Sequence, residues 1–320
     1  MSDLHGTPDP PPSGGGPGPL ARRGGEERPM SIPGAIGWTV GVTALFLFLL
    51  GLISSFRMEP ALDGAGSFRA APKLDVIGSF ACQAAAYLLG LFGVLQVHAP
   101  RASIRQFLGV RGTHVAFYPL AIALGFALEG PIAALYTAIE GRWPSGIDDA
   151  ELVRVFVDAS APERAALGLI FIVLGPALEE VFFRGALVRP LRWTHRAPLV
   201  IAITAALFAV AHVGWQKFLP IGIFGAALGV LRIASGSLLP SILLHGTYNA
   251  IQCFSLLSAA GAGAADGAPS AAGAALPDAA GSPVWLVAVS SASALVLTAL
   301  ACVLGRRAEG AARAREKDLS

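Results

Sequence analysis

Three charged residues, Glu179, Glu180 and Arg184, lie inside a stretch of sequence that is otherwise apolar. In a bilayer each such group costs about 2.5–3.5 kcal/mol on insertion scales, so it persists only where partners or water satisfy it. Glu180 and Arg184 are four residues apart, which places them on one helix face where they can form an ion pair. Glu179 lies about 100° around the same helix, on one face with Phe183, and is left free to face another group.

Two histidines and one asparagine occur in later apolar stretches, and each can work together with a carboxylate. His212 shares a helix face with Phe208, and His245 shares one with Asn249. A carboxylate beside a histidine can act as a general base on water, and His245 and Asn249 can donate hydrogen bonds to a developing oxyanion. Glutamate and histidine are also zinc ligands, so Glu179, His212 and His245 permit a metal-activated water instead. Both routes lead to hydrolysis of an acyl bond.

Each of these residues also has a structural explanation when it is taken alone. A histidine or asparagine in a membrane helix often hydrogen-bonds a neighbouring helix, and a Glu–Arg pair can lock two helices together. Two glutamates, two histidines and an asparagine in three apolar stretches favour a shared site over five separate structural roles.

The composition predicts a membrane protein whose helices position these groups. Only 14% of the 320 residues are charged and 54% are hydrophobic, whereas a soluble domain carries about 25% charged residues. The apolar residues gather in long stretches, so we predict an all-α, polytopic transmembrane helix bundle of about eight spans. These stretches are residues 34–56, 76–97, 115–139, 165–190, 197–214, 218–233, 238–258 and 283–304.

The distribution of lysine and arginine predicts that both termini lie in the cytoplasm. Residues 98–114 and 189–196 are basic, residues 140–164 are acidic overall, and residues 259–282 contain no lysine or arginine. The chain is rich in alanine, glycine and arginine, which suggests a bacterial inner membrane protein. The candidate groups lie roughly 10–22 Å from the cytoplasmic ends of their helices, so we expect one cavity that opens to the cytoplasm. A net charge of +2 gives no reason to expect nucleic acid binding.

Composition divides the chain into five regions. Residues 1–33 are rich in proline and glycine and should be disordered. Residues 34–164 contain the N-terminal transmembrane helices, and residues 165–260 form a core that carries every candidate site residue. A flexible Ala/Gly loop at 261–282 precedes the last transmembrane helix and a basic cytoplasmic tail at 283–320.

Three motifs follow one another in the apolar stretches: EExxxR at 179–184, FxxxH at 208–212 and HxxxN at 245–249. Motifs of other intramembrane proteases are missing, since the sequence contains no HExxH, no GxGD and no complete GxSG. The ordered trio resembles the CPBP family of type II CAAX prenyl endopeptidases and bacteriocin-processing or immunity membrane proteins. The resemblance covers roughly residues 165–260, and it implies an α-helical intramembrane endopeptidase, often described as a metalloprotease.

The resemblance also implies roles for the motif residues. Glu179 would be the base that activates water, and His212 would assist it. His245 and Asn249 would form the oxyanion site or part of a metal site, and Glu180 would complete the catalytic set. The supporting positions of the motifs are Arg184, Phe183 and Phe208. A zinc site and a metal-free site would use the same residues, so both routes stay open, and the expected substrate is a membrane-associated protein or peptide.

Two other classes of function are compatible with the same residues. A non-catalytic immunity or scaffold protein of this fold would keep its phenotype when Glu179 or His212 is replaced by alanine, whereas an enzyme would lose it. A proton-coupled transporter would use the buried charges as a proton relay, but no inverted repeat of broken helices favours that function.

Overall fold

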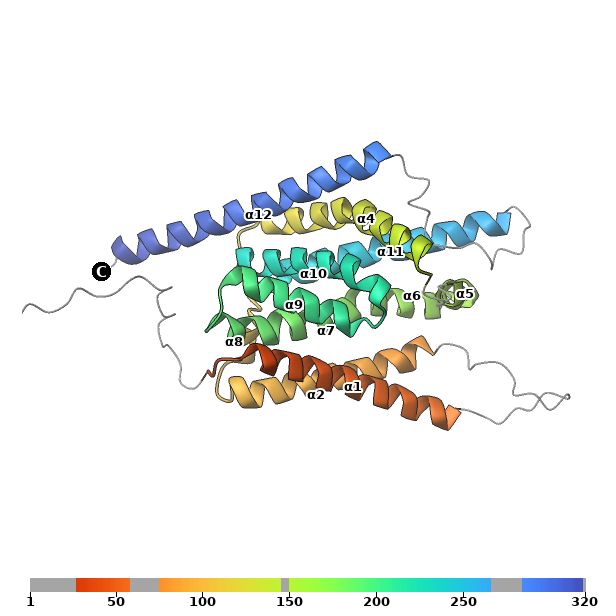
Figure 1. Cartoon of the computed structure of the whole chain (residues 1–320), viewed down its shortest axis with the longest axis horizontal. Helices are drawn as coiled ribbons and strands as arrows, with labels where there is room; N and C mark the ends of the chain where they lie inside the picture. Colours follow the sequence, from red (N-terminus) through yellow and green to blue (C-terminus); the bar gives the residue numbers. More distant parts are fainter. Residues whose placement is uncertain (1–26, 58–74, 145–149, 266–283, 319–320) are drawn as a thin grey trace, which may run out of the picture.

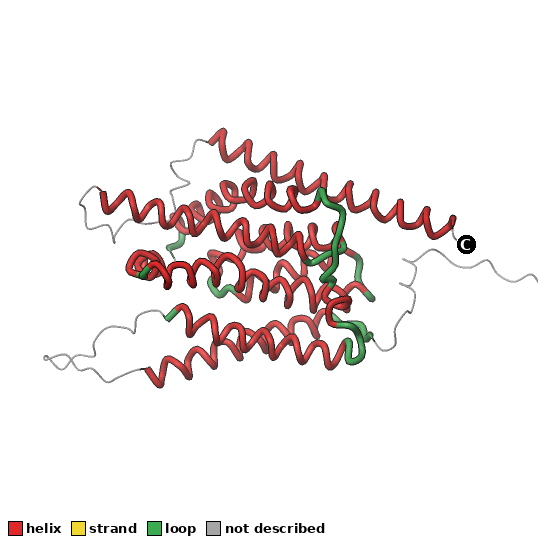
Figure 2. The backbone as a smooth tube through the Cα atoms, turned by 180° about the vertical axis from the view of Figure 1, so that it is seen from behind, coloured by secondary structure: helices red, strands yellow, loops and turns green. Residues whose placement is uncertain are grey.

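The computed structural model describes residues 27–57, 75–144, 150–265 and 284–318. These residues form helices joined by short turns, with no strand among them (Figures 1 and 2), so the all-α prediction is confirmed. Most of the tail predicted to be disordered and most of the predicted Ala/Gly loop lie outside the described residues.

Each predicted apolar stretch is helical over most of its length, but the helix at 239–265 ends seven residues after its predicted stretch and the helix at 284–318 ends 14 residues after its own. Two short helices, at 104–108 and 150–158, lie in segments that were predicted as loops. The helices are α1 (Ile32–Arg57), α2 (Val76–His98), α3 (Ile104–Leu108), α4 (Phe117–Arg142), α5 (Ala150–Asp158), α6 (Ala161–Leu169), η1 (Ile170–Leu174), α7 (Gly175–Glu180), η2 (Val181–Leu187), α8 (Val188–Arg192), α9 (Ala197–Ala211), α10 (Trp215–Ser235), α11 (Leu239–Ala265) and α12 (Val284–Asp318). The segments α6 to α8 join end to end into one rod, in which η1 and η2 are π-helical turns.

Six helices among the described residues are long and apolar enough to cross a membrane, which supports an integral membrane protein. They are α1, α2, α4, the rod from α6 to α8, α10 and α12. Helix α9 is apolar but shorter, and α11 is not among the six. The count of about eight spans therefore stays a prediction, which requires α9 and α11 to cross as well.

The rod lies at the centre of the bundle (Figure 1). Helices α1 and α2 pair on one side of it, where α2 packs on α7 and η2. Helices α10 and α11 lie on the other side, and α4 and α12 cover them in turn. Two glycines allow the close approaches that this arrangement needs. A Cβ atom at Gly225 would lie 3.2 Å from the backbone of Ala205, and one at Gly246 would lie 2.7 Å from the Ile172 carbonyl oxygen.

The basic turns gather at one end of the bundle, together with the start of α1 and the end of α12 (Figure 1). Backbone hydrogen bonds join these segments, because the Arg28 amide donates to His98 and the Met30 amide donates to Pro190. Helix α5 and the end of α11 lie at the other end. The basic loops that were predicted to be cytoplasmic thus lie at one end of the bundle, and α5, which belongs to the acidic segment, lies at the other.

A reporter fusion should test the predicted orientation. Alkaline phosphatase is active only outside the cytoplasm, so we expect strong activity when it is fused after Arg142 and weak activity when it is fused after Arg111. The reason is that lysine and arginine in short loops are retained in the cytoplasm. The reverse pattern of activity would contradict cytoplasmic termini.

Candidate active site

The two adjacent glutamates lie where the rod departs from regular α-helix. The short α7 carries both of them, with one π-helical turn before it and another after it. Such turns are rare and occur frequently at functional sites, because they change which side chains share a face. The sequence indicated a helix here but gave no signal of the π turns.

Glu180 and Arg184 form the predicted ion pair, which is confirmed. Arg184 Nη1 lies 2.8 Å from Glu180 Oε1, and both side chains are fully buried, with 0% exposed. Arg184 Nη2 donates to the Gly225 carbonyl of α10 at 2.8 Å, and the guanidinium lies over the Phe208 ring of α9. The buried Phe183 ring packs edge-on against the same phenylalanine. The pair therefore holds the rod against α9 and α10.

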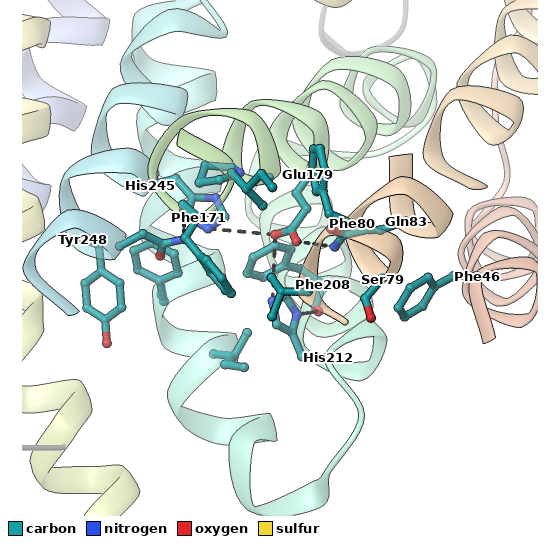
Figure 3. Close-up of a pocket in the computed structure, with 17 residues that line it drawn as sticks. Phe46, Ser79, Phe80, Gln83, Phe171, Glu179, Phe208, His212, His245 and Tyr248 are labelled. Carbon is teal, nitrogen blue, oxygen red and sulfur yellow. Dashed lines mark hydrogen bonds and ion pairs between the residues drawn. The ribbon is translucent and has the colours of Figure 1, made fainter. Parts of the chain in front are cut away.

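Helix α9 ends at Ala211, three residues earlier than the predicted stretch, and His212 occupies the turn that follows. The chain reverses there through Val213, with φ 48°, and Gly214, with φ 115°. Few residues with a β-branched side chain adopt a positive φ, so this turn is held by its surroundings. His212 precedes this reversal and keeps right-handed helical dihedrals, with φ −82° and ψ 0°, and its side chain points toward Glu179 (Figure 3).

Glu179 and both histidines converge on one point (Figure 3). Glu179 Oε2 lies 3.8 Å from His212 Nε2 and 3.9 Å from His245 Nε2. The other ring nitrogens are engaged elsewhere, His212 Nδ1 with the Phe208 carbonyl at 2.8 Å and His245 Nδ1 with Glu180 Oε1 at 3.3 Å.

These contacts assign the tautomers of the two rings. A carbonyl oxygen and an ion-paired carboxylate only accept hydrogen bonds, so each Nδ1 donates, and in a neutral ring each Nε2 carries a lone pair. Two ring nitrogens and the Glu179 carboxylate oxygen thus form a group of three acceptors, and both Nε2 atoms lie too far from Oε2 for a hydrogen bond. A water molecule has two hydrogens, so it can donate to two of these three acceptors at a time.

Glu179, His212, His245 and Asn249 line a cavity of about 430 Å³. Their side chains differ in exposure, since 12% of Glu179, 30% of His212 and 5% of His245 are accessible. Most of the remaining wall is apolar or aromatic. The aromatic residues that line it are Phe46, Phe80, Phe171, Phe208, Phe224 and Tyr248.

Glu180, Arg184 and Phe183 are fully buried and do not line the cavity. Their position matches a supporting role, although Glu180 was predicted as part of the catalytic set. Val76, from the first turn of α2, does line the cavity, as does His212 at the end of α9. These two helix ends lie at the end of the bundle away from the basic turns, which were predicted to be cytoplasmic (Figure 1). Their position therefore does not support a cavity that opens to the cytoplasm, and that opening stays a prediction.

Asn249 satisfies a backbone group that the rod cannot satisfy by itself. In η1 the Gly175 amide donates to the Ile170 carbonyl. The next carbonyl, that of Phe171, would meet residue 176 in the same register, and Pro176 has no N–H to donate. Asn249 Nδ2 donates to this Phe171 oxygen at 2.8 Å. The amide therefore has one hydrogen left for the predicted contact with an oxyanion.

The spacing of the three convergent atoms does not fit a zinc ion as they stand. Tetrahedral zinc with bonds of about 2.0–2.2 Å keeps its ligand atoms about 3.3–3.5 Å apart, whereas Glu179 Oε2 lies 3.8 and 3.9 Å from the two Nε2 atoms. Within the described ranges, no group of three or more His, Cys, Asp or Glu side chains is placed to hold a metal ion. We therefore derive no step through a metal.

Gln83 of α2 is a contact of Glu179 that the sequence analysis missed. Its Nε2 donates to Glu179 Oε1 at 3.0 Å (Figure 3). An amide inside an apolar stretch is the signal that could have found it, because a polar side chain in a membrane helix needs a partner.

Comparisons with known proteins agree with this core. Residues 161–251 match the model of the type II CAAX prenyl endopeptidase Rce1-like family, which confirms the resemblance predicted from the motifs. An uncharacterized 24.3 kDa protein of Escherichia coli is 35% identical over 101 residues. This match covers 29% of the present chain and 46% of the relative, so it spans slightly less than half of that protein. No solved structure matches the chain.

Proposed function

We propose that this chain, whose residues 161–251 match a family of membrane proteases, is an intramembrane endopeptidase in which Glu179 activates water. The observation that carries the proposal is the convergence of Glu179 Oε2 with His212 Nε2 and His245 Nε2 in one cavity of a membrane helix bundle. A water molecule can donate to two of these three acceptors, Glu179 Oε2 and one Nε2 atom, which orients it, and the carboxylate can then take its proton.

The reaction then follows as hydrolysis of a peptide bond. Water bound between Glu179 and His212 loses a proton to Glu179 as its oxygen attacks the carbonyl carbon. The resulting oxyanion accepts a hydrogen bond from the remaining amide hydrogen of Asn249, and from His245 Nε2 when that ring carries both protons. Glu179 passes the proton to the leaving nitrogen as the C–N bond breaks, so one water and one peptide bond give a carboxylic acid and an amine, which then exchange one proton to become a carboxylate and an ammonium group.

The wall of the cavity supports a protein or peptide substrate that reaches it within the bilayer. Apolar and aromatic side chains make up most of that wall, and three of its polar residues, Gln83, His212 and His245, face Glu179. Specific pockets commonly have this composition, in which apolar surface binds and a few polar groups orient the ligand. We place the protein in a bacterial inner membrane, as its composition and topology predict.

New protein termini provide the test of this function. Membranes that contain the wild-type protein or its Glu179→Ala variant, at equal abundance, should differ in a set of termini present only with the wild type. The position of these termini in their proteins also shows whether cleavage takes place on the cytoplasmic side. Identical sets of termini, with both proteins folded, would favour a non-catalytic scaffold or immunity protein.

Removal of metal ions separates the two routes to an activated water. Because the three convergent atoms are spaced more widely than zinc ligands, we expect the purified protein to keep its rate of cleavage in a strong chelator. Metal analysis of the same sample should find less than one zinc per chain. Loss of cleavage in the chelator, with recovery on addition of zinc, would contradict this expectation and assign Glu179, His212 and His245 as ligands.

A further inference from the structure

The two oxygens of the Glu179 carboxylate have different surroundings. Oε1 accepts a hydrogen bond from Gln83 Nε2 at 3.0 Å, and Oε2 faces the Nε2 atoms of His212 and His245. Figure 3 shows the carboxylate between these groups, with Gln83 on the side away from His245. Gln83 comes from α2, which lies outside the segment 161–251 that matches the protease family.

The side chain of Gln83 is held in place by the packing of α2 on the rod. Gln83, Tyr87 and Gly90 share one face of α2, because they are four and then three residues apart. The Tyr87 ring is buried and packs edge-on against Phe182, with 5.3 Å between ring centroids. At Gly90 the two helices approach so closely that a Cβ atom would lie 3.3 Å from the Phe182 ring. The donor therefore stands on a rigid surface directly beside α7.

We infer that Gln83 is a positioning residue for the water-activating carboxylate, an inference that rests on the proposed function. A carboxylate without this contact rotates about its last bond and exchanges its two oxygens. The hydrogen bond at Oε1 stops this exchange and leaves Oε2 directed at the histidines. The N-terminal helices thereby become part of the active site, and α2 contributes a side chain to it.

Substitution of Gln83 by methionine removes the donor and keeps the length of the side chain. The matched control is Gln96→Met, which makes the same change at an exposed position of the same helix. The substrate is a peptide that spans a cleavage site found to depend on Glu179. Groups that orient catalytic side chains contribute about 10–100-fold to the rate. Gln83→Met should therefore lower kcat by about that factor and leave KM within about twofold of the wild-type value. Gln96→Met should change neither kcat nor KM.

A second measurement shows whether the effect passes through Glu179. Thermal unfolding of the full chain in detergent is compared for the wild type, Gln83→Met, Glu179→Ala and the double variant. A hydrogen bond between the two residues predicts that Gln83→Met lowers Tm in the wild-type background and has almost no effect when Glu179 is alanine. Equal effects in both backgrounds would overturn the inference.

Three other outcomes would also overturn the inference that Gln83 positions Glu179. A folded Gln83→Met protein with wild-type kcat would overturn the inference and leave the proposed function intact, because cleavage that depends on Glu179 has then already been measured. Failure of Gln83→Met to fold, while Gln96→Met folds, would assign Gln83 a purely structural role and also overturn it. Identical termini with and without Glu179 would overturn the proposed function, and the inference with it.

Discussion

Glu179→Gln is expected to lower the rate of peptide cleavage by about 10²–10⁴-fold, the usual contribution of a general base, and to leave Tm nearly unchanged. Glutamine has the size of glutamate and keeps a carbonyl oxygen that can accept the hydrogen bond from Gln83. It cannot take a proton from water. The side chain lies in the wall of a cavity, and among the described residues its ion-pair contacts are with His212 and His245 and not with an arginine or lysine, so the substitution leaves none of the described arginines or lysines buried without a partner.

The measurement is the rate of cleavage of an identified substrate, together with thermal unfolding of the same preparations. The control is Glu129→Gln in α4, which makes the same change in another membrane helix at a residue that does not line the cavity. This control should cleave at the wild-type rate. A Glu179→Gln protein that keeps more than about a tenth of the wild-type rate would show that another group activates the water.

Local periodicity explains which features of the site could be predicted from the sequence. Glu180 and Arg184 lie one helical turn apart, so their pairing follows from the geometry of a single helix, and the structure confirms it. Long apolar stretches likewise predict helices, because a buried or lipid-facing backbone must satisfy its own hydrogen bonds. Each predicted stretch is helical over most of its length for the same reason.

Features that depend on contacts between distant helices could not be predicted in this way. Gln83 and Glu179 are separated by 96 positions, and only the packing of α2 on the rod brings them together. The role of Asn249 at the Phe171 carbonyl depends on a π turn and on Pro176, which a regular 3.6-residue period does not reveal. Sequence reasoning thus identified Asn249 as a candidate and missed the contact that occupies one of its hydrogens.

Arg184→Met is expected to lower the free energy of unfolding by about 3–5 kcal/mol, because it leaves the Glu180 carboxylate buried without a cation. Both side chains are fully buried, with 0% exposed. The pair is also incompletely satisfied, since Glu180 Oε2 and Arg184 Nε have no hydrogen-bond partner among the described residues. Burial of charge therefore cancels much of the attraction within the pair, and removal of one partner costs far more than the intact pair contributes.

Two comparisons separate this explanation from a simple loss of packing. Arg189→Met makes the same change in the ion pair with Glu27, where 33% of the arginine side chain is exposed, and solvent screening should limit its cost to about 1 kcal/mol or less. The double variant Glu180→Gln and Arg184→Met removes both charges and should recover much of the stability that Arg184→Met loses, because no unpaired ion stays buried. Chemical unfolding of the full chain in detergent measures all of these differences. A double variant as unstable as Arg184→Met alone would contradict the electrostatic explanation and assign the loss to the contacts of the arginine with Phe208 and Gly225.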